Sequence, residues 1–577
     1  MAERRNITTL KEMLYTIGRR YAGKIALQEK KSTGYNKIYY QQMLRAARTL
    51  TTRLIGLGLK KTERVALICE NRPEWAIVFF AVVSSGGVAV PLDTKQTEAE
   101  LVNRIRHCEA KIIFVDEELF LVLDKLRSSL PFVETVITLT AKRMREEILC
   151  LEEMLQKTTE YLERDVYPDD VALMVYTSGT TSIIKAAELT HANLMFEIWT
   201  IDKVLNFVEN DRFLSILPLH HSFEITGGLL APLLCGASVT YNLQVLKSQE
   251  LITTMCQIRA TIILTVPLLL RKLYGRMVKN IKNLPWPKKM GFYFLYWVAK
   301  GFSRLNIYPG RRLFRSLHKT FGGELRAFIS GAAPLDPAII KTFEILGVTV
   351  LQGYGLTETS PVIAVNTFMK NRIGSVGEPL PGVKVKILPL PGHAGGEILT
   401  RGPHIMKGYF RNKELTSEVI RDGWFYTGDI GRLDRHGHLY ILGRVKNLIV
   451  TGVGKKVYPE EVEEEILKSP YIKELCVMGR VRRDEHKKGS EDVYAVIVPD
   501  LDYFKEHNAN TDCGNIREVI SREIKKYRSN LSKYKWIKDF DIVLEELPKT
   551  NTRKIVRSKV AEMIGKQIRP QTADHRP

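Results

Sequence analysis

Apolar and polar positions along the first half of the chain follow two different periods. Met43, Ala47, Leu50 and Leu54 recur at helical spacing, which predicts an amphipathic helix from about residue 39 to Gly56. Short, continuous apolar runs of strand length separate such helical segments. The predicted strands are residues 65–69, 88–92 and 111–115, and the predicted helices between them are residues 75–83 and 98–108. Strands that alternate with helices indicate right-handed βαβ units and a parallel sheet.

The alternation resumes at residues 171–176, an apolar run long enough for a buried parallel strand. The further strands predicted in this part of the chain are residues 213–217, 237–241 and 261–265. Thr190 is a plausible N-cap for a helix that follows it. The sequence therefore predicts an α/β fold with more than one layered sheet in the N-terminal part.

From residue 383 the chain turns to short alternating strands with glycine-rich turns, which are typical of a small barrel or an edge sheet. Pro459 then starts a new α/β pattern, with acids in the first helical turn. We place a boundary near residues 443–446. The prediction is a large N-terminal domain of layered α/β sheets with a small β-barrel-like part, residues 1–443, and a smaller α+β C-terminal domain, residues 447–577.

Composition narrows the class of protein. Lys plus Arg number 86 against 64 Asp plus Glu, and the net charge of +22 favours anionic partners. The seven cysteines are scattered without CxxC spacing, so we expect a reduced, cytoplasmic chain without disulfides or a zinc site. The N-terminus lacks the apolar core of a signal peptide. The apolar stretches at residues 76–92 and 225–234 are interrupted by Gly or Pro, so they indicate buried core rather than membrane spans.

The stretch at residues 271–319 combines basic and aromatic residues and contains neither Asp nor Glu. Such a composition suits the surface of a bilayer that carries anionic lipid, and a solvated basic face over a core stripe is the alternative. No nucleic-acid-binding signature accompanies the charge, so nucleic acid is not an expected partner. The membrane interpretation predicts peripheral attachment to the inner face of the cytoplasmic membrane.

A polar loop at residues 177–185 (TSGTTSIIK) lies between the strand predicted at residues 171–176 and the helix predicted after Thr190. Its hydroxyls, its glycine and its lysine could surround the oxygens of a polyphosphate, and the lysine would neutralise charge. The loop is not a Walker A motif, because G-x-x-x-x-G-K-[ST] is absent. Taken alone, the loop is equally well explained as an ordinary polar surface turn.

Five further motifs occur in a fixed order along the chain. They are residues 330–335 (SGAAPL), 353–360 (GYGLTETS), 423–431 (GWFYTGDIG), 443–446 (GRVK) continuing to 457–461 (VYPEE), and 547–554 (LPKTNTRK). With the polar loop, these motifs resemble the adenylate-forming ANL superfamily, and within it the acyl-CoA synthetases of the long-chain fatty acid–CoA ligase type. The resemblance covers roughly residues 10–565.

The resemblance implies a two-step reaction that uses ATP, Mg²⁺ and coenzyme A. A carboxylate attacks the α-phosphate of ATP to give an acyl-adenylate and pyrophosphate, and the thiol of coenzyme A then displaces AMP. A fatty acid is already ionised at pH 7, so the first step needs positioning and charge stabilisation rather than a general base. This requirement fits a sequence without a recognisable Ser-His-Asp arrangement.

The resemblance also assigns roles to individual residues of the nucleotide site. Phosphate binding would involve Thr177, Ser178, Gly179, Thr180, Thr181 and Lys185, and the adenine would be lined by Gly331, Ala332, Ala333, Gly353, Tyr354 and Gly355. Thr357 would contact phosphate, and Glu358 would hold Mg²⁺. The structural alternatives are that residues 353–355 form a mere turn and that Glu358 is a surface acid.

Five more positions match the family pattern outside those loops. Asp429 would accept the ribose hydroxyls with Arg444 as its companion, although an acid in this turn could instead form an Asx-turn. Lys446 occupies the hinge, residues 444–446, about which a mobile C-terminal domain rotates between the half-reactions. Lys554 would bring a cation to the carboxylate and the α-phosphate. His221 would lie where the acyl and nucleotide sites meet, unless it is simply a core histidine.

The sequence departs from the family pattern at four positions. Ser182, Ile184 and Ala186 replace a glycine, a proline and a glycine of the phosphate loop, and Arg553 replaces the glycine before Lys554. If position 182 needs a positive φ, serine there costs on the order of 1 kcal/mol. Every charged or hydroxyl-bearing group of the two motifs is retained, so the changes bear on rate and nucleotide affinity more than on chemistry.

The leading hypothesis is a long- or medium-chain fatty acid–CoA ligase. Two alternatives stay open: an acyl-adenylate ligase that loads an acyl carrier protein, and a catalytically weakened homologue that binds nucleotide or acyl groups. The length and type of the acyl chain are not encoded in any motif, because the acyl pocket is formed by scattered apolar side chains.

Overall fold

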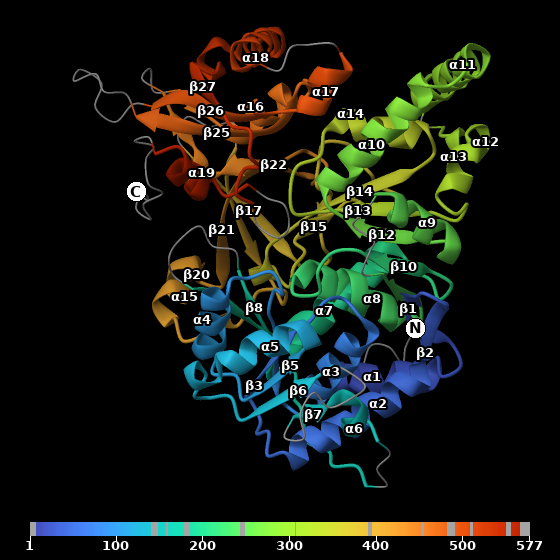
Figure 1. Cartoon of the computed structure of the whole chain (residues 1–577), viewed down its shortest axis with the longest axis vertical. Coiled ribbons are helices and arrows are strands. Elements are labelled where there is room, and N and C mark those ends of the chain that lie inside the picture. Colours follow the sequence, from blue (N-terminus) through green and yellow to red (C-terminus); the bar gives the residue numbers. More distant parts are fainter. Residues whose placement is uncertain are drawn as a thin grey trace. The chain divides into compact units, whose positions relative to one another are not determined.

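The computed structural model describes residues 7–139, 148–156, 160–177, 184–242, 248–305, 307–390, 395–451, 455–481, 491–507, 512–549 and 555–565. Figure 1 shows the whole chain. It divides into two compact units. Unit 1 comprises Met1–Thr177, Ile184–Lys384 and Arg401–Gly423, and unit 2 comprises Ser178–Ile183, Val385–Thr400 and Trp424–Pro577. The expected domain boundary at residue 443 and the hinge at residues 444–446 stay predictions.

The first sheet of unit 1 has the order β16-β15-β14-β13-β12-β10-β11-β1-β2 among the described strands. Strands β11, β10, β12, β13 and β14 are mutually parallel neighbours, as the βαβ pattern predicted. The bounds are β1 Ile25–Lys31, β2 Gly34–Tyr39, β10 Arg212–Ser215, β11 Ser238–Tyr241, β12 Ile262–Thr265, β13 Ala327–Ser330, β14 Thr349–Tyr354, β15 Ala364–Val365 and β16 Glu378–Pro379.

The second sheet of unit 1 has the order β19-β9-β8-β4-β3-β5-β6-β7 among the described strands. Its central strands are parallel, whereas β8 and β9 form an antiparallel pair with Tyr176 opposite Ala186. The bounds are β3 Arg64–Ile68, β4 Val88–Pro91, β5 Ile112–Val115, β6 Thr135–Thr138, β7 Leu149–Cys150, β8 Val171–Tyr176, β9 Ala186–Thr190 and β19 Gly408–Tyr409. A short further strand, β20, is Ile420–Arg421.

Helices of unit 1 cover these sheets. Their bounds are α1 Leu10–Arg20, α2 Tyr40–Gly56, α3 Pro73–Ser84, α4 Glu98–Cys108, α5 Glu117–Lys125, α6 Leu151–Met154, α7 His191–Leu205, α8 Ala231–Cys235, α9 Ser248–Ile258, α10 Pro267–Lys282, α11 Trp286–Ser303, α12 Gly310–Leu313, α13 Arg315–Thr320, α14 Pro337–Ile345 and α15 Lys413–Val419. Shorter turns are the 3₁₀ segments η2 Arg127–Ser129 and η4 Thr357–Thr359 and the π-helix η3 Glu224–Leu230.

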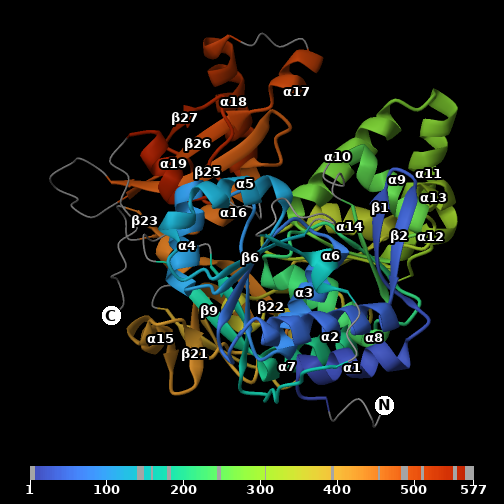
Figure 2. The same ribbon diagram turned by 60° about the horizontal axis from the view of Figure 1, so that its bottom comes forward.

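The predicted helix near residues 39–56 is confirmed as α2, which buries Met43, Ala47, Leu50 and Leu54. Helix α3 is apolar all round, and its residues are buried because it contacts strands of both sheets, β1 on one side and β3 and β4 on the other. Figure 2 shows α1, α2 and α3 packed side by side. The apolar stretches expected as core are indeed core rather than membrane spans.

Unit 2 begins with antiparallel strands, in the region where the sequence predicted a small barrel or edge sheet. Strand β18 pairs with β21, and β21 pairs with β22. The bounds are β17 Lys384–Pro389, β18 Gly396–Arg401, β21 Trp424–Leu433 and β22 Leu439–Arg444, followed by the 3₁₀ turn η5 Val445–Asn447.

The remainder of unit 2 is an α+β arrangement around the sheet β25-β26-β27. Its apolar core includes Val462 and Ile466 of α16 and Ile520 of α18. Pro459 occupies the first turn of α16 with acids beside it, as predicted. The bounds are β23 Ile449–Val450, β24 Lys456–Val457, α16 Pro459–Ile466, β25 Ile472–Val481, β26 Glu491–Pro499, α17 Leu501–Glu506, α18 Cys513–Tyr527, η7 Arg528–Asn530, η8 Lys533–Lys535, β27 Asp539–Ile542 and α19 Arg557–Met563.

Within the described ranges, no helix has the length and apolar character that a membrane span would need.

Candidate active site

Three of the predicted site segments lie at one edge of the first sheet of unit 1. His221 follows β10, residues 331–333 follow β13, and Thr357 and Glu358 follow β14. These strands are parallel neighbours or next neighbours, so their carboxyl ends share one edge. Open α/β sheets bind ligands in the crevice beyond that edge. The structure therefore brings together segments that are far apart in the sequence.

Two contacts join these segments. The Ser222 hydroxyl donates a hydrogen bond of 3.3 Å to Oγ1 of Thr357. A Cβ atom on Gly331 would lie 3.2 Å from the ring of Phe223, so the absence of a side chain at position 331 lets that ring approach the β13 loop. The segment that carries His221 thus contacts both the loop after β13 and the loop after β14.

The polar loop at residues 177–185 joins two antiparallel strands. The interpretation that it connects a strand to a helix was wrong, because β9 intervenes between Lys185 and the N-cap Thr190 of α7. The N–H of Thr177 donates to the carbonyl oxygen of Lys185 at 2.9 Å and closes the base of the hairpin. The loop therefore leads into a strand and not directly into a helix N-terminus.

The departures in this loop fall on different structural positions. Ile184 is exposed just before Lys185, whereas Ala186 is buried and already paired with Tyr176 in the ladder. A strand position requires no glycine, which explains why alanine is accepted at position 186. The departure at Ser182 lies outside the described residues. So do Ser178, Gly179, Thr180 and Thr181, whose phosphate contacts stay predictions.

Glu358 and Lys185 are linked by a tyrosine that the sequence analysis did not single out. The Tyr409 hydroxyl donates to Oε1 of Glu358 at 2.8 Å. The Lys185 ammonium lies 5.9 Å from the centroid of the Tyr409 ring, within range of a cation–π attraction. Burial, and then the carboxylate of Glu358, raises the pKa of the Tyr409 phenol, so it remains a hydrogen-bond donor at neutral pH.

Tyr409 is held in place by the backbone of the second sheet. It pairs with Ala187 in the β19–β9 ladder, and Lys407 and Phe410 on either side donate N–H bonds to the carbonyls of Glu188 and Ala186. The N–H of Met406 donates to the carbonyl oxygen of Glu358 at 2.9 Å. Both the side chain and the backbone of Glu358 are therefore tied to residues 406–409.

Helix α7 supports the same region through two buried polar side chains. Asn193 donates both amide hydrogens to backbone carbonyls, at 2.7 Å to Pro403 and at 2.9 Å to Ile405. Glu197 accepts the N–H of Val362 at 2.7 Å, just beyond the Glu358 turn. Buried polar groups of this kind cost free energy unless they are paired, so their pairing fixes the local backbone. Their i, i+4 spacing on an otherwise apolar helix is a signal that the sequence carries.

His221 is a half-buried histidine whose Nε2 atom is buried. Burial, and then the neighbouring His220, lowers its pKa to about 3. The two rings lie 4.3 Å apart between centroids, and Nε2 of His221 has no hydrogen-bond partner among the described residues. An imidazole in this state can accept or donate one hydrogen bond to a bound ligand but carries no charge at pH 7. A role at the acyl–nucleotide junction stays a prediction.

The glycines predicted to line adenine differ in how strictly the structure requires them. A Cβ on Gly355 would lie 1.8 Å from the carbonyl oxygen of Pro361, so the chain's own backbone excludes a side chain there. A Cβ on Gly353 would make only ordinary contact, 3.4 Å from Val365. Ala332 adopts a left-handed φ of 69°. Tyr354 ends β14, and its stacking on adenine stays a prediction together with the roles of Gly331 and Ala333.

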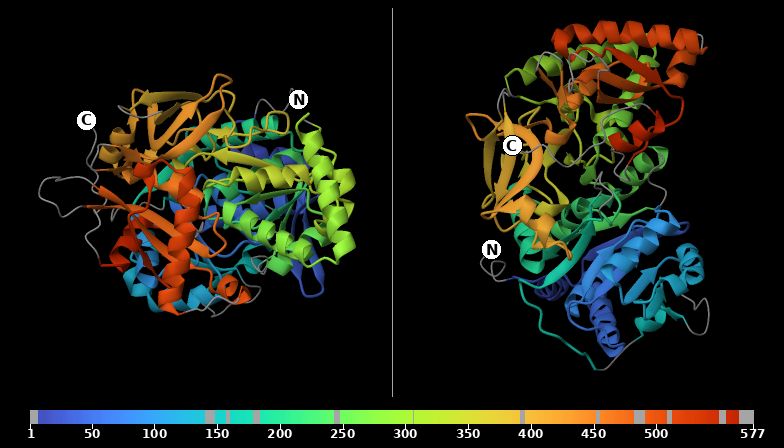
Figure 3. Two further views of the ribbon diagram at one scale, coloured as in Figure 1. Left: turned by 90° about the horizontal axis from the view of Figure 1, so that it is seen from above. Right: turned by 90° about the vertical axis from the view of Figure 1, so that its left-hand side faces the viewer.

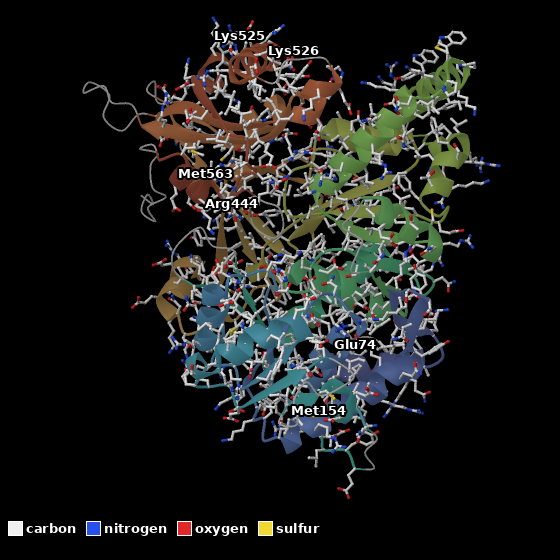
Figure 4. The ribbon with its side chains drawn as sticks, in the orientation of Figure 1. Glu74, Met154, Arg444, Lys525, Lys526 and Met563 are labelled. Atoms are coloured by element: carbon white, nitrogen blue, oxygen red, sulfur yellow. The ribbon has the colours of Figure 1, made fainter. Side chains whose placement is uncertain are left out.

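Within unit 2, Asp429 and Arg444 form a direct ion pair. They lie opposite each other in the β21–β22 ladder, and Nε of Arg444 is 2.8 Å from Oδ1 of Asp429. Asp429 is 4% exposed, whereas Arg444, labelled in Figure 4, is half-buried. The hydroxyl of Thr427 accepts the N–H of Asp429 at 3.0 Å. The predicted partnership of these residues is present, and their contact with ribose stays a prediction.

The remaining predicted residues are in unit 2. Lys446 lies in η5, where the adjacent Asn447 donates to Oε1 of Glu460 of α16 at 2.8 Å. Its hinge role stays a prediction. Lys554 and Arg553 lie outside the described residues, and so does their predicted contact with substrate.

The family is established by comparison with known proteins. The model of the AMP-binding enzymes matches residues 15–410, and the model of the AMP-binding enzyme C-terminal domain matches residues 461–554. The chain belongs to the AMP-binding enzyme family, which confirms the resemblance to the adenylate-forming superfamily.

Curated relatives act on different carboxylic acids. The chain is similar to the chloroplastic long-chain-fatty-acid–[acyl-carrier-protein] ligase AEE15 of Arabidopsis thaliana, with 27% identity over 89% of this chain and 79% of that protein. It is similar to the long-chain-fatty-acid–CoA ligase FadD15 of Mycobacterium bovis, with 28% identity over 89% of each chain. It is also similar to the indoleacetate–CoA ligase of Aromatoleum aromaticum, with 27% identity over 92% of this chain and 93% of that protein.

Solved structures share the fold. ATP-bound MatB from Rhodopseudomonas palustris has a TM-score of 0.75 at 27% identity and covers 96% of this chain and 99% of its own. The o-succinylbenzoate coenzyme A synthetase MenE from Bacillus subtilis, in complex with ATP and a magnesium ion, has a TM-score of 0.72 at 22% identity, covering 94% and 98%. The anthranilate CoA ligase AuaEII with anthranoyl-AMP has a TM-score of 0.76 at 23% identity, covering 96% and 97%.

Proposed function

We propose that this chain activates a long- or medium-chain fatty acid as an acyl-adenylate and transfers the acyl group to coenzyme A, releasing AMP and pyrophosphate. The coarser activity, an AMP-forming ligase that joins a carboxylic acid to the thiol of coenzyme A or of a carrier protein, follows from the family. ATP, Mg²⁺ and coenzyme A, the predicted cofactors, agree with the relatives and with the ATP-bound and magnesium-bound neighbours.

The observation that carries the proposal is the chain of contacts from Lys185 through Tyr409 to Glu358. It places one cation over the ring and one carboxylate at the hydroxyl of a single side chain. Glu358 and the Thr357 hydroxyl are hard oxygen donors of the kind that suit Mg²⁺ bound to nucleotide phosphates. The magnesium ion would neutralise charge on the phosphates, and Lys185 would do the same from the hairpin.

Each remaining residue has a positioning task in this proposal. Ser222 orients the Thr357 hydroxyl, and Asp429 with Arg444 would receive the ribose. Lys554 would offset repulsion between the carboxylate and the α-phosphate. A neutral His221 leaves the entering carboxylate without a nearby buried positive charge, so the attack would depend on Lys554 and the metal.

Fatty acid specificity rests on relatives named as long-chain fatty acid ligases. A carrier protein in place of coenzyme A is the second candidate, favoured by the similarity to a ligase of that type. A weakened, ligand-binding homologue is favoured only by the altered phosphate loop, with Ser182, Ile184 and Ala186. Attachment to an anionic membrane surface through residues 271–319 is part of the proposal.

The test is pyrophosphate release from ATP with a panel of carboxylic acids that includes fatty acids, indoleacetate and anthranilate. Each acid is assayed alone, with coenzyme A, and with a phosphopantetheinylated acyl carrier protein. Fatty acids should support release, and coenzyme A should convert them to acyl-CoA. Preference for an aryl acid would overturn the fatty acid assignment. Turnover that requires the carrier protein would select the second candidate. The absence of turnover with any acid would leave the weakened homologue.

A further inference from the structure

Residues 267–320 form a helical subdomain at one side of unit 1, which comprises α10, α11, α12 and α13. Figure 3 follows these light-green helices as they project from the sheet. One face of α11 is firmly packed: Phe292, Leu295, Tyr296 and Ala299 join a core with Phe314, Ile345 and Leu346. Closely packed glycines fix the neighbouring α12, because a Cβ on Gly310 would lie 2.3 Å from the carbonyl oxygen of Ile345.

The opposite face of α11 is apolar as well, and it is exposed. Trp286 is 74% exposed, Phe294 66% and Trp297 73%. We call this the outer face, and it consists of Trp286, Met290, Tyr293, Phe294 and Trp297. The spacing i, i+4, i+7, i+8 and i+11 places all five on one stripe of the helix. The sequence showed the aromatic residues but could not separate the packed ones from the exposed ones.

Exposed basic side chains lie at the end of α11 and on the helices α12 and α13 of the same subdomain. Lys300 and Arg304, both exposed, lie at the end of α11, and exposed residues 311, 312 and 315 of α12 and α13 are arginines. Neither Asp nor Glu occurs between residues 271 and 323. Among acids on the helix beneath, Glu344 of α14 is half-buried and accepts a hydrogen bond from Asn371 at 2.7 Å. The exposed rim of the outer face is therefore positively charged.

We propose that the outer face of α11 docks on a bilayer that contains anionic lipid, with its aromatic side chains in the interface and its basic rim against the headgroups. Trp and Tyr favour this depth because each has an apolar ring and a polar atom. Since the other face of α11 is packed against protein, the helix would lie on the membrane and not across it. The proposal takes from the proposed function only the fatty acid, a substrate that partitions into bilayers.

Charge argues against two other occupants. A second copy of this surface would bring two positive rims together, which costs free energy. Nucleic acid would satisfy the basic side chains but would leave the apolar stripe of Trp286, Met290 and Trp297 without a matching surface. An anionic bilayer is the partner that satisfies both the apolar stripe and its rim.

The test is flotation of the full chain with vesicles of phosphatidylcholine alone and of phosphatidylcholine mixed with phosphatidylglycerol. The wild-type protein should float with the mixed vesicles, and brominated lipid should quench its tryptophan emission. The triple variant Trp286→Ser, Phe294→Ser, Trp297→Ser should lose most of this binding. Its matched control replaces three exposed apolar residues elsewhere in unit 1, with Leu121→Ser, Leu162→Ser and Met369→Ser, and should bind as the wild type does.

The basic rim is tested by the double variant Lys300→Gln, Arg304→Gln. Its control is the double variant Lys37→Gln, Lys125→Gln, at exposed sites elsewhere. Partitioning into mixed vesicles should fall about fivefold for each charge removed from the rim. Equal binding by the wild type and the triple variant would overturn the proposal, and so would self-association that the triple variant abolishes. Pyrophosphate release without vesicles should be unchanged in all variants, so a failure of the proposed activity is distinguishable from a failure of docking.

Discussion

The Tyr409 hydroxyl donates a hydrogen bond of 2.8 Å to Oε1 of Glu358, while the Tyr409 ring faces the ammonium of Lys185. The two contacts connect the hairpin after β8 with the loop after β14. Tyr409 touches neither reacting atom in the proposed chemistry, so it acts as a positioning residue for the carboxylate that would bind magnesium.

Tyr409→Phe removes the hydroxyl and keeps the ring beneath Lys185. A hydrogen bond to a charged group contributes about 1.5–3 kcal/mol, so kcat/KM for pyrophosphate release should fall roughly tenfold or more. The magnesium concentration needed for half-maximal rate should rise, because the carboxylate is no longer oriented. Tyr167→Phe, at an exposed tyrosine, is the control. Unchanged magnesium dependence in Tyr409→Phe would show that the hydroxyl does not position Glu358.

The Asp429–Arg444 pair should be coupled in nucleotide binding. Asp429→Asn and Arg444→Gln should each raise KM for ATP, and the double variant should lose less than the sum, with a coupling of about 0.5–3 kcal/mol. Arg432→Gln, in the same strand as Asp429, serves as the control. Strict additivity of the two substitutions would contradict a shared role in the site.

Lys554→Ala should separate the two half-reactions. Adenylate formation should fall by orders of magnitude, because no other assigned side chain brings positive charge to the attacking carboxylate. Thioester formation from supplied acyl-adenylate and coenzyme A should be spared. Lys559→Ala, an exposed lysine of α19, is the matched control. Equal losses in both half-reactions of Lys554→Ala would remove its assigned role.

Buried neutral histidines make stability sensitive to acid. Burial lowers the pKa of His404 to about 4, so the unfolded state binds more protons than the folded state between that value and about pH 6.5. The free energy of unfolding should therefore fall on acidification through this window, by about 1.4 kcal/mol per pH unit for each such imidazole.

His404→Gln should weaken that dependence when urea unfolding at about pH 7.5 is compared with about pH 5.5. The same substitution at the exposed His436 should leave the pH dependence of the free energy of unfolding unchanged. Burial raises the pKa of Glu224 to about 8, so this carboxyl makes the free energy of unfolding rise on acidification through the same window. Its contribution is common to both variants and cancels in the comparison. If the free energy of unfolding of His404→Gln depended on pH as strongly as that of the wild type, a buried neutral imidazole at this position would be contradicted.

Periodicity in the sequence was sufficient to predict α2, α3 and α4 and the strands β3, β4, β5, β8, β10, β11 and β12, because each buries an apolar face or run against neighbours. The hairpin after β8 was missed, since residues 186–190 are few and were assigned to the approach of α7. Strand pairing across the chain decides such short elements, and a local pattern cannot show it.

The motifs singled out Glu358, Asp429 and Arg444, and the structure shows the ion pair between the last two, while the roles of all three in the site stay predictions. The position of Tyr409 could not be predicted, because its partner Glu358 is 51 residues away in sequence and only the β19–β9 ladder brings them together. Asn193 and Glu197 could have been found, since polar residues at i, i+4 on an apolar helix need buried partners. The outer face of α11 needed the packing of α14 to separate exposed from buried aromatic residues.

The central claim is that a carboxylate attacks the α-phosphate of ATP. A fatty acid whose carboxylate carries heavy oxygen, incubated with ATP, Mg²⁺, coenzyme A and the enzyme, tests it directly. If the carboxylate attacks the α-phosphate, the released AMP should contain one heavy oxygen atom, because the bridging oxygen of an acyl-adenylate comes from the carboxylate and leaves with AMP. Heavy oxygen in inorganic phosphate with formation of ADP, or acyl-CoA formed with unlabelled AMP, would contradict it.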